Sequence, residues 1–287
     1  MDQRTYWNSD AGETWAKEAG RLDAMLAPIG DAVIAALAPR SGERVLDVGC
    51  GAGFTSRAMA ALGADVLGVD VSAPLLGVAQ GAGGGPRYLL ADAGGDPLPG
   101  PFEALFSRFG VMFFPDPPGA FAHLRTAMAP GARMAFVCWR TMLENDWARE
   151  PLAATLPHLS APPEAPDPHA PGPFAFADPE RTRGILTSAG WRDVSLEPLS
   201  LPYRVGVDVE DALSLMLKIG PTGRLLREQP EAAAKALPAL RALMEKRAGP
   251  EGVTFTAAVW LVRGRAQRAC AFHSAAVWPQ RSTGSAS

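Results

Sequence analysis

The sequence predicts an α/β fold in three layers, with helices on both faces of a mostly parallel sheet of seven strands. Two observations predict this fold. Between residues 44 and 139, short runs rich in β-branched and aromatic residues alternate with Ala-rich segments of helical character. Glycine or proline follows two of these helical segments, as expected where a helix ends before the next strand. Such alternation is typical of βαβ units around a parallel sheet.

The individual elements follow from this alternation. We expect strands at residues 44–48, 65–69, 87–91, 104–109, 133–139, 192–196 and 253–262. We expect helices between them at residues 53–62, 73–81 and 117–129. Gly63 is predicted to end the first of these helices and Pro130-Gly131 the third. Asp178 and Pro179 indicate the N-cap and first position of a further helix, which ends near Gly190.

Two inserts and two terminal regions surround this core. Residues 1–40 are predicted to form an N-terminal helical cap, with two amphipathic helices over 9–38. Prolines concentrated in residues 141–177 exclude a long helix or a central strand there, so we expect a Pro-rich lid insert. Leucines at helical spacing predict a helical lid insert at 207–249. The core then comprises 41–140, 178–206 and 250–266, and small polar residues predict a disordered tail at 275–287.

Composition restricts the class of protein. A formal net charge of -3 and a pI of about 5.9, with scattered Lys and Arg, disfavour a nucleic-acid partner. The three cysteines, Cys50, Cys138 and Cys270, lack the paired spacing of a disulfide framework or zinc site, so no metal is expected. No targeting segment or run of ~18 apolar residues is evident. We therefore expect a cytoplasmic protein without integral membrane association, as a monomer or homodimer.

A glycine-rich turn follows the first predicted strand. In Asp47-Val48-Gly49-Cys50-Gly51-Ala52-Gly53, three glycines stand where the chain turns sharply from strand to helix and a ligand approaches the backbone. Backbone amides of such a turn are expected to point at the ligand. The spacing is GxGxG, whereas dinucleotide binders have GxGxxG.

Aspartates end the next two predicted strands. Asp70 closes the second strand, where a carboxylate accepts hydrogen bonds from both hydroxyls of a ribose. Asp92 closes the third. Because the carboxyl ends of parallel strands meet at one edge of the sheet, we expect Asp47, Asp70 and Asp92 to converge on one crevice.

The motifs together resemble class I S-adenosylmethionine-dependent methyltransferases, in their type-11-like small-molecule branch near the ubiquinone and menaquinone enzymes. The resemblance rests on the glycine-rich turn and on residues 106–117 and 124–137, and covers residues 41–140. It implies a Rossmann-like sandwich whose last strand is antiparallel, and S-adenosyl-L-methionine as the cofactor. The charges of this cofactor also match a loop of amides with carboxylates nearby.

The resemblance also implies a set of cofactor-binding residues. Asp92 would read the adenine amino group, and Arg108 and Phe109 would lie against the methionine part. Aromatic side chains of the N-terminal cap, such as Trp15, either face the sulfonium or only pack the helix to the core. The predicted cofactor-binding residues are Asp47, Gly49, Cys50, Gly51, Gly53, Phe54, Asp70, Val71, Asp92, Ala93, Arg108, Phe109 and Trp15.

The methyl acceptor is expected to be a small molecule held by the two inserts, because both leave the core at the carboxyl ends of strands. Direct methyl transfer needs alignment and desolvation, and needs a base only if the acceptor must lose a proton. His123, His158, His169 and Tyr203 are possible bases. No catalytic residue is singled out among them.

Two other functions remain open. One is an NAD(P)-dependent oxidoreductase, although the sequence lacks both the GxGxxG spacing and a Tyr-x-x-x-Lys pair. The second is a protein that binds the cofactor without transferring its methyl group.

Overall fold

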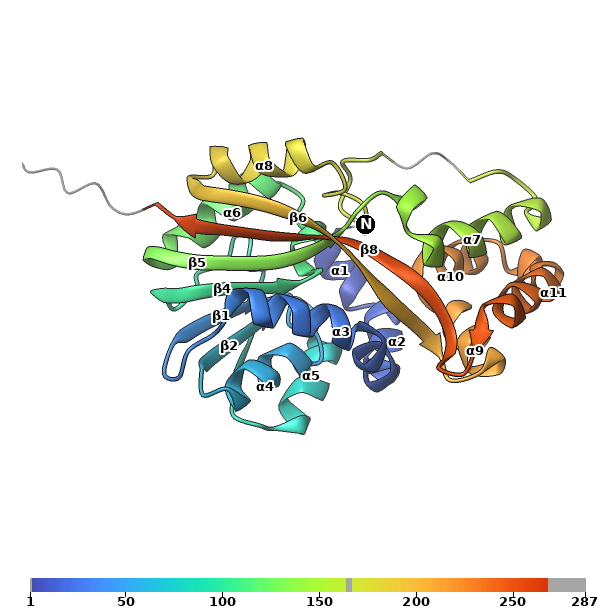
Figure 1. The fold of residues 1–287 in the computed structure, drawn as a ribbon, viewed down its shortest axis with the longest axis horizontal. Helices are drawn as coiled ribbons and strands as arrows, with labels where there is room; N and C mark the ends of the chain where they lie inside the picture. The colour runs from blue at the N-terminus through green and yellow to red at the C-terminus, as the bar shows by residue number, and fades with distance from the viewer. Residues whose placement is uncertain (1, 164–166, 268–287) are drawn as a thin grey trace, which may run out of the picture.

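A single sheet forms the centre of the computed structural model, which describes residues 2–163 and 167–267 (Figure 1). The strand order is β3-β2-β1-β4-β5-β8-β6, and β7 pairs with β8. The strands are β1 (Arg44–Val48), β2 (Asp65–Asp70), β3 (Arg87–Leu90), β4 (Phe102–Arg108), β5 (Met128–Trp139), β6 (Trp191–Gly206), β7 (Ala248–Gly249) and β8 (Gly252–Ala266). Strands β1 to β5 pair in parallel, and β8 runs antiparallel to both β5 and β6. The three-layer α/β fold with an antiparallel last strand is therefore confirmed.

The sheet has one strand more than predicted. The additional strand, β7, is two residues long and turns directly into β8. Gly252, at the start of β8, has a φ of +96°, which a residue with a side chain rarely adopts. Only the pairing reveals so short a strand, because two residues carry no periodicity.

Strand β6 is much longer than the predicted range 192–196. Pro198 and Pro202 interrupt the pattern in sequence, but both pair with β8, opposite Trp260 and Thr256. Strand β6 lies at the edge of the sheet, where a residue without an N–H group is tolerated. Together β6 and β8 continue past the carboxyl ends of the other strands (Figure 1).

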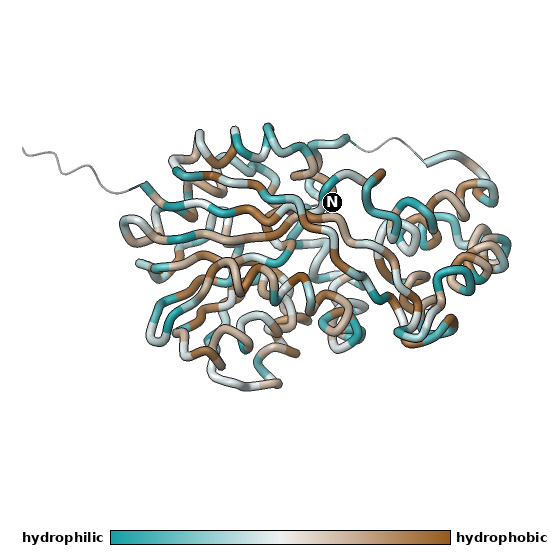
Figure 2. Tube along the Cα trace, viewed as in Figure 1, coloured by the Kyte–Doolittle hydropathy of each residue, from teal (hydrophilic) through white to brown (hydrophobic). Residues whose placement is uncertain are grey.

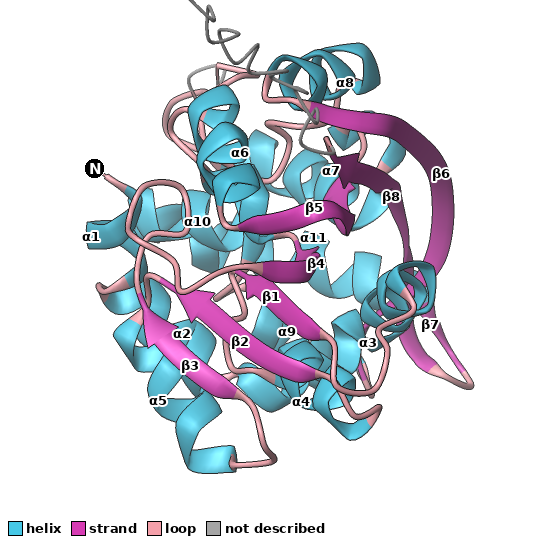
Figure 3. Cartoon of the chain, turned by 90° about the vertical axis from the view of Figure 1, so that its left-hand side faces the viewer, coloured by secondary structure: helices cyan, strands magenta, loops and turns pink. Residues whose placement is uncertain are grey.

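Helices cover both faces of the sheet (Figure 3). On one face lie α3 (Ala19–Leu37), α4 (Phe54–Ala61) and α5 (Ala73–Ala82), and on the other lie α6 (Pro117–Thr126) and α8 (Pro179–Ser188). Helix α8 begins after the predicted N-cap, since Asp178 accepts hydrogen bonds from the Glu180 and Arg181 amides. Apolar residues concentrate in the strands between these layers (Figure 2).

The predicted end of α6 is wrong. The helix stops at Thr126, and Pro130 and Gly131 lie inside β5, where its register with β4 shifts. The two residues lie at a β-bulge. A Pro-Gly pair is found both where a helix ends and at a bulge, so the sequence alone does not distinguish the two.

Three helices form the N-terminal region. The two predicted helices correspond to α2 (Asp10–Lys17) and α3, and α1 (Gln3–Trp7) precedes them. Asp2 caps α1 and Ser9 caps α2. Helix α1 escaped prediction because five residues are too few to show helical periodicity.

Both inserts lie beyond the carboxyl ends of the parallel strands (Figure 1). The Pro-rich insert begins with η2 (Met142–Glu144), α7 (Asp146–Thr155) and η3 (Leu156–His158), so its prolines limit regular structure only after that point. The second insert holds α9 (Val209–Met216), α10 (Gly220–Glu228) and α11 (Pro230–Arg247), as its composition predicts. Leu213, Leu240 and Met244 are buried in the same continuous core as the sheet. This insert is therefore part of the main hydrophobic core.

Some predictions lie beyond these elements. The predicted disordered tail at 275–287 and Cys270 fall outside the described residues. Within residues 2–163 and 167–267, no helix combines the length and apolarity needed to span a bilayer. The same residues contain no group of His, Cys, Asp and Glu side chains arranged for a metal ion.

Candidate functional site

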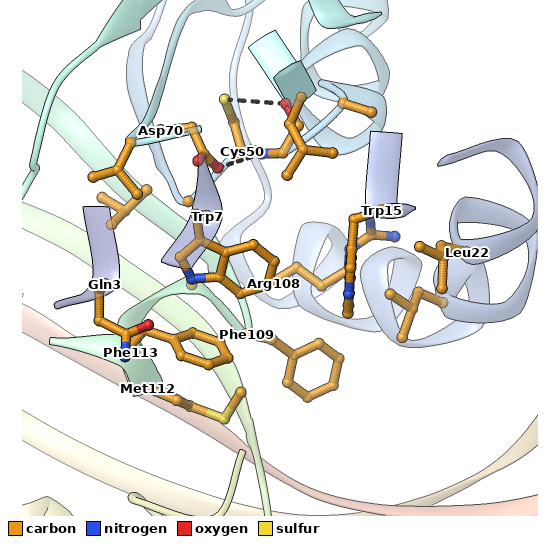
Figure 4. Close-up of a pocket in the computed structure, with 18 of the residues that line it drawn as sticks. Gln3, Trp7, Trp15, Leu22, Cys50, Asp70, Arg108, Phe109, Met112 and Phe113 are labelled. Atoms are coloured by element: carbon orange, nitrogen blue, oxygen red, sulfur yellow. Dashed lines mark hydrogen bonds between the residues drawn. The ribbon is translucent and has the colours of Figure 1, made fainter. Parts of the chain in front are cut away.

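A cavity opens at the carboxyl ends of β1, β2 and β4, beside the loop after β3 (Figure 4). The N-terminal helices and both inserts complete its wall. Of the predicted cofactor-binding residues, ten line it: Trp15, Gly49, Cys50, Gly51, Asp70, Val71, Asp92, Ala93, Arg108 and Phe109. Asp47, Gly53 and Phe54 do not.

The glycine-rich turn brings two loops into contact. Gly49 has a φ of +67°, and a Cβ atom there would lie 2.6 Å from the Cα of Gly110 in the loop after β4. Only glycine permits both the dihedral angle and this approach. The turn therefore shapes the cavity floor through backbone geometry.

The amides of the turn are already used within the protein. Gly49 and Cys50 N–H both donate to the Val69 carbonyl, at 2.8 and 3.2 Å. Gly51 N–H donates to Asp70 Oδ2 at 2.8 Å, and Gly53 N–H donates to the Cys50 carbonyl at 2.9 Å. The prediction that these amides point at the ligand is wrong, because the turn stabilises itself and its neighbouring strand instead. A pyrophosphate would find few free donors here.

Asp70 forms part of the cavity wall. Besides accepting from Gly51, its Oδ1 accepts a hydrogen bond from the Ser72 amide at 2.9 Å. Burial raises the pKa of this carboxyl above its ordinary value, although the two amide hydrogen bonds oppose the shift. Each oxygen retains a lone pair for a hydroxyl of a ligand.

Asp47 lies beneath the turn. Its Oδ2 accepts hydrogen bonds from the hydroxyls of Thr55 and Ser56, at 2.9 and 2.6 Å, while its Oδ1 is buried with no partner within residues 2–163 and 167–267. Burial raises the pKa of Asp47 to about 6, against the effect of the two hydroxyls. Asp47 therefore supports the turn from below instead of forming the cavity wall.

The loop after β3 holds the third aspartate. Asp92 Oδ1 accepts from the Gly94 amide at 2.8 Å, and the Asp92 amide donates to Asp96 Oδ2 at 2.8 Å. These bonds fix the turn that places Asp92 and Ala93 in the cavity wall. The predicted convergence therefore holds for Asp70 and Asp92.

Arg108 provides a buried cation at the end of β4. Its Nη2 lies 2.7 Å from Asp23 Oδ1 on α3, and the two side chains are 11% and 15% exposed. Its Nη1 is buried and has no hydrogen-bond partner in the described part of the chain. The guanidinium lies 5.8 Å from the Phe54 ring centroid, so Phe54 packs behind Arg108 and away from the cavity. Gly53 instead packs against Tyr88.

Helix α1 closes one side of the cavity. Asn8 fixes its end, because Nδ2 donates to the Val71 carbonyl at 2.7 Å and Oδ1 accepts from the Ala73 amide at 2.9 Å. The Trp7 ring packs edge-on against Trp15 and Phe113, with centroids 5.5 and 5.3 Å apart. Trp15 therefore lines the cavity and packs against Trp7, while its predicted contact with a sulfonium stays a prediction.

Aromatic side chains form the opposite part of the cavity wall. Phe109 stacks on Trp139 with centroids 4.2 Å apart, and Trp139 contacts Trp147 at 4.7 Å. Tyr203 packs against both tryptophans, at 5.6 and 5.4 Å. Burial raises the pKa of Tyr203, so its hydroxyl stays protonated at neutral pH.

A buried asparagine positions Trp147. The Trp147 indole N–H donates to Asn145 Oδ1 at 2.9 Å. Asn145 is fully buried and exchanges hydrogen bonds with both the amide and carbonyl of Ala258 in β8. This residue was not predicted, because its partner lies in a distant strand.

The histidines considered as bases lie elsewhere. His123 Nε2 is 2.9 Å from the Asp96 carbonyl oxygen, and neither His123, His158 nor His169 is part of the cavity wall. Of the four candidates, the structure brings only Tyr203 to the cavity.

Comparisons with known proteins agree with this architecture. Residues 46–136 match a family model described as a methyltransferase domain. Over these residues the chain is similar to class I methyltransferase domains of the type-11 kind. The domain covers β1 to most of β5, including the glycine-rich turn and the ends of β2, β3 and β4.

Relatives with curated names are similar over this domain. A ubiquinone biosynthesis O-methyltransferase of Methylococcus capsulatus is 34% identical over 102 residues, which are 33% of this chain and 43% of the relative. A malonyl-[acyl-carrier protein] O-methyltransferase of Serratia marcescens is 32% identical over 126 residues, 42% of this chain and 49% of the relative. The chain thus matches less than half the length of each.

Solved structures share the fold over most of the chain. Phosphoethanolamine N-methyltransferase 2 of Haemonchus contortus, in complex with S-adenosyl-L-methionine, superposes with a TM-score of 0.56 at 15% identity. That alignment covers 93% of this chain and 60% of the other. Magnesium protoporphyrin IX methyltransferase of Synechocystis, with bound SAH, gives a TM-score of 0.53 at 15% identity and covers 92% and 97%.

Proposed function

We propose that the protein binds S-adenosyl-L-methionine in this cavity and transfers its methyl group to a small-molecule acceptor. The observation that carries the proposal is the division of one cavity into two chemically different halves. We call the part lined by Asp70, Val71, Asp92 and Ala93 the nucleoside half, and the part lined by Phe109, Trp139, Trp147 and Tyr203 the acceptor half. The Asp23–Arg108 pair also lines the cavity.

The residues fit the cofactor group by group. Asp70 would accept hydrogen bonds from the two ribose hydroxyls, and Asp92 and Ala93, at the next strand of the sheet, would hold the base. The Nη1 atom of Arg108 would pair with the carboxylate of the methionine part. When bound, S-adenosylmethionine supplies an electrophilic methyl group on a sulfonium centre.

The acceptor half positions the nucleophile and excludes water. Its titratable group, Tyr203, is a poor base at neutral pH, because burial raises the pKa of its hydroxyl. The aromatic wall therefore acts by alignment and desolvation, with the Tyr203 hydroxyl as a polar contact for the acceptor.

The inserts supply much of the acceptor half. Trp147 and Pro173 come from the Pro-rich insert, and Ile219 and Gly220 precede and begin α10 in the helical insert. We propose that these segments act as lids over the acceptor, while the N-terminal cap closes the nucleoside half. The division of the chain into cap, core and lids remains a prediction, as do a cytoplasmic location and a monomeric or homodimeric state.

The two other functions fit this cavity less well. An NAD(P)-dependent oxidoreductase would need loop amides for a pyrophosphate, and four amides of the turn donate within the protein instead. A protein that only binds the cofactor would not need a second, aromatic half.

Calorimetry tests the proposal directly. The purified protein is titrated with S-adenosylmethionine, S-adenosylhomocysteine, NAD and NADH, and then incubated with methyl-labelled S-adenosylmethionine and a metabolite extract. We expect binding of the two adenosyl compounds alone, and labelled product together with S-adenosylhomocysteine. Selective binding of NAD or NADH would overturn the proposal, and label transfer without S-adenosylhomocysteine would contradict methyl transfer.

A further inference from the structure

Gln3 presents an unsatisfied polar group at the cavity. Its side chain lines the cavity, and its Oε1 atom is buried without a hydrogen-bond partner among the residues that the structure describes, 2–163 and 167–267. Two polar side chains near it are engaged, since Arg4 pairs with Asp96, and Asn8, which caps the end of α1, bonds the backbone at Val71. A buried acceptor without a partner destabilises the protein unless a ligand supplies a donor. This atom therefore indicates a ligand contact.

Gln3 lies at the nucleoside half. The neighbouring Arg4 reaches Asp96, whose carboxylate also accepts the Asp92 amide at 2.8 Å. In Figure 4, Gln3 lies beside Phe113, on the opposite side of the view from Trp15 and Leu22. Phe113 in turn contacts Trp7, one helical turn along α1. These contacts place the Gln3 amide near the loop that carries Asp92.

The chemistry of a carboxamide suits an adenine edge. It presents an acceptor and a donor side by side, which match the 6-amino group and an adjacent ring nitrogen of adenine. The amino group has two hydrogens, so the Asp92 carboxylate and Gln3 Oε1 can each accept one. With the ribose held at Asp70 on β2, the base would extend toward β3, where Gln3 of α1 also lines the cavity.

We infer that Gln3 recognises the adenine base of the cofactor through a paired hydrogen bond. This inference rests on the proposed function. It gives α1 a role beyond covering the cavity, because a residue near the start of the chain then contributes to selection of the nucleoside.

The test combines a variant with a modified ligand. Gln3→Met keeps the length of the side chain and removes its amide, and Gln80→Met makes the same change on the exposed surface of α5. Calorimetry measures the affinity of each protein for S-adenosylhomocysteine and for its analogue in which hydrogen replaces the 6-amino group of adenine. Thermal unfolding without ligand shows whether each variant is folded.

We expect Gln3→Met to weaken S-adenosylhomocysteine binding about tenfold and to change binding of the analogue by much less. Gln80→Met should leave both affinities unchanged. Equal weakening for both ligands would overturn the inference, because α1 would then only cover the cavity, and so would unchanged affinity for both. If the unaltered protein bound neither ligand, the proposed function itself would fail, and the inference with it.

Discussion

The two halves of the cavity are built in different ways. In the nucleoside half, the contacts come from short polar side chains and backbone at the ends of adjacent strands, as with Asp70 and the amides of Gly51 and Ser72. In the acceptor half, large aromatic rings come from segments far apart in the chain, such as Trp139, Trp147 and Tyr203. The difference separates a region defined by the turn chemistry of the core from one defined by packing of the inserts.

This difference implies that the two halves respond separately to mutation. A change in the nucleoside half should alter cofactor affinity, whereas a change in the acceptor half should alter turnover while cofactor affinity persists.

The largest effect is expected at Asp70. Asp70→Ala removes the carboxylate assigned to the ribose and leaves the Gly51 and Ser72 amides without their acceptor, so S-adenosylhomocysteine affinity should fall roughly 100-fold. Asp65→Ala is the matched control, because Asp65 begins the same strand at the opposite, exposed end. Calorimetry measures both. Similar affinities for the two variants would remove the basis for the nucleoside half.

A smaller effect is expected at Trp147, and it should fall on methyl transfer instead of cofactor affinity. Trp147→Ala opens the aromatic wall, so labelled methyl transfer to a metabolite extract should fall about tenfold or more while S-adenosylhomocysteine affinity stays within about twofold. Leu143→Ala, in the same insert but 80% exposed, should change neither. A large loss of cofactor affinity in Trp147→Ala would show that the halves are not separate.

Asp47 predicts a pH effect on stability. Its pKa of about 6 in the folded protein exceeds the ordinary 3.8, so the folded state binds more protons than the unfolded state between these values. The contribution of this carboxyl to the free energy of unfolding therefore falls as pH rises from about 4 to about 6, and is constant above. The Asp47→Asn variant lacks this loss. Between pH 4 and pH 7, its free energy of unfolding should therefore rise by up to about 3 kcal/mol relative to that of the unaltered protein.

Urea unfolding at a series of pH values measures this difference. Asp65→Asn serves as the control, because Asp65 lies exposed in the neighbouring strand and pairs only with Arg87. A stability difference between Asp47→Asn and the unaltered protein that does not vary with pH would contradict the raised pKa.

The smallest effect is expected at the Arg4–Asp96 ion pair. Both side chains are about half exposed, at 58% and 43%, so the pair is screened by water. Arg4→Met should lower the free energy of unfolding by less than about 1 kcal/mol, since Asn8 and Trp7 fix α1 independently. Denaturant unfolding measures this change. A loss of several kcal/mol would mean that charge, not backbone hydrogen bonding, holds the cap on the nucleoside half.

The same contrast explains how much the sequence could predict. Gly49, Asp70 and Asp92 were predictable, because a turn that needs glycine and a carboxylate that ends a strand are local features of the chain. Tyr203 was considered only as a possible base beyond the strand expected at 192–196, since prolines hid the length of β6. Pairings across the fold, such as Arg108 with Asp23 and Trp147 with Asn145, depend on which elements become neighbours. No local sequence pattern indicates which distant elements pack together.

The glycine-rich turn shows a second limit of prediction from sequence. Its position and its glycines were predicted, yet its amides donate to Val69, Cys50 and Asp70 instead of facing the ligand. The sequence specifies that the chain turns sharply, but where each N–H points depends on the neighbouring strand. The aspartate that begins the motif was likewise predicted at the cavity, and lies beneath it because Thr55 and Ser56 hold its carboxylate.

A crystal structure with S-adenosylhomocysteine tests the two-half cavity most directly. We expect the ribose hydroxyls on Asp70, the base beside Asp92 and Gln3, the carboxylate on Arg108, and the sulfur facing the wall of Trp139, Trp147 and Tyr203. A nucleoside lying against that aromatic wall, or a sulfur facing away from it, would contradict the division of the cavity and the direction of methyl transfer proposed from it.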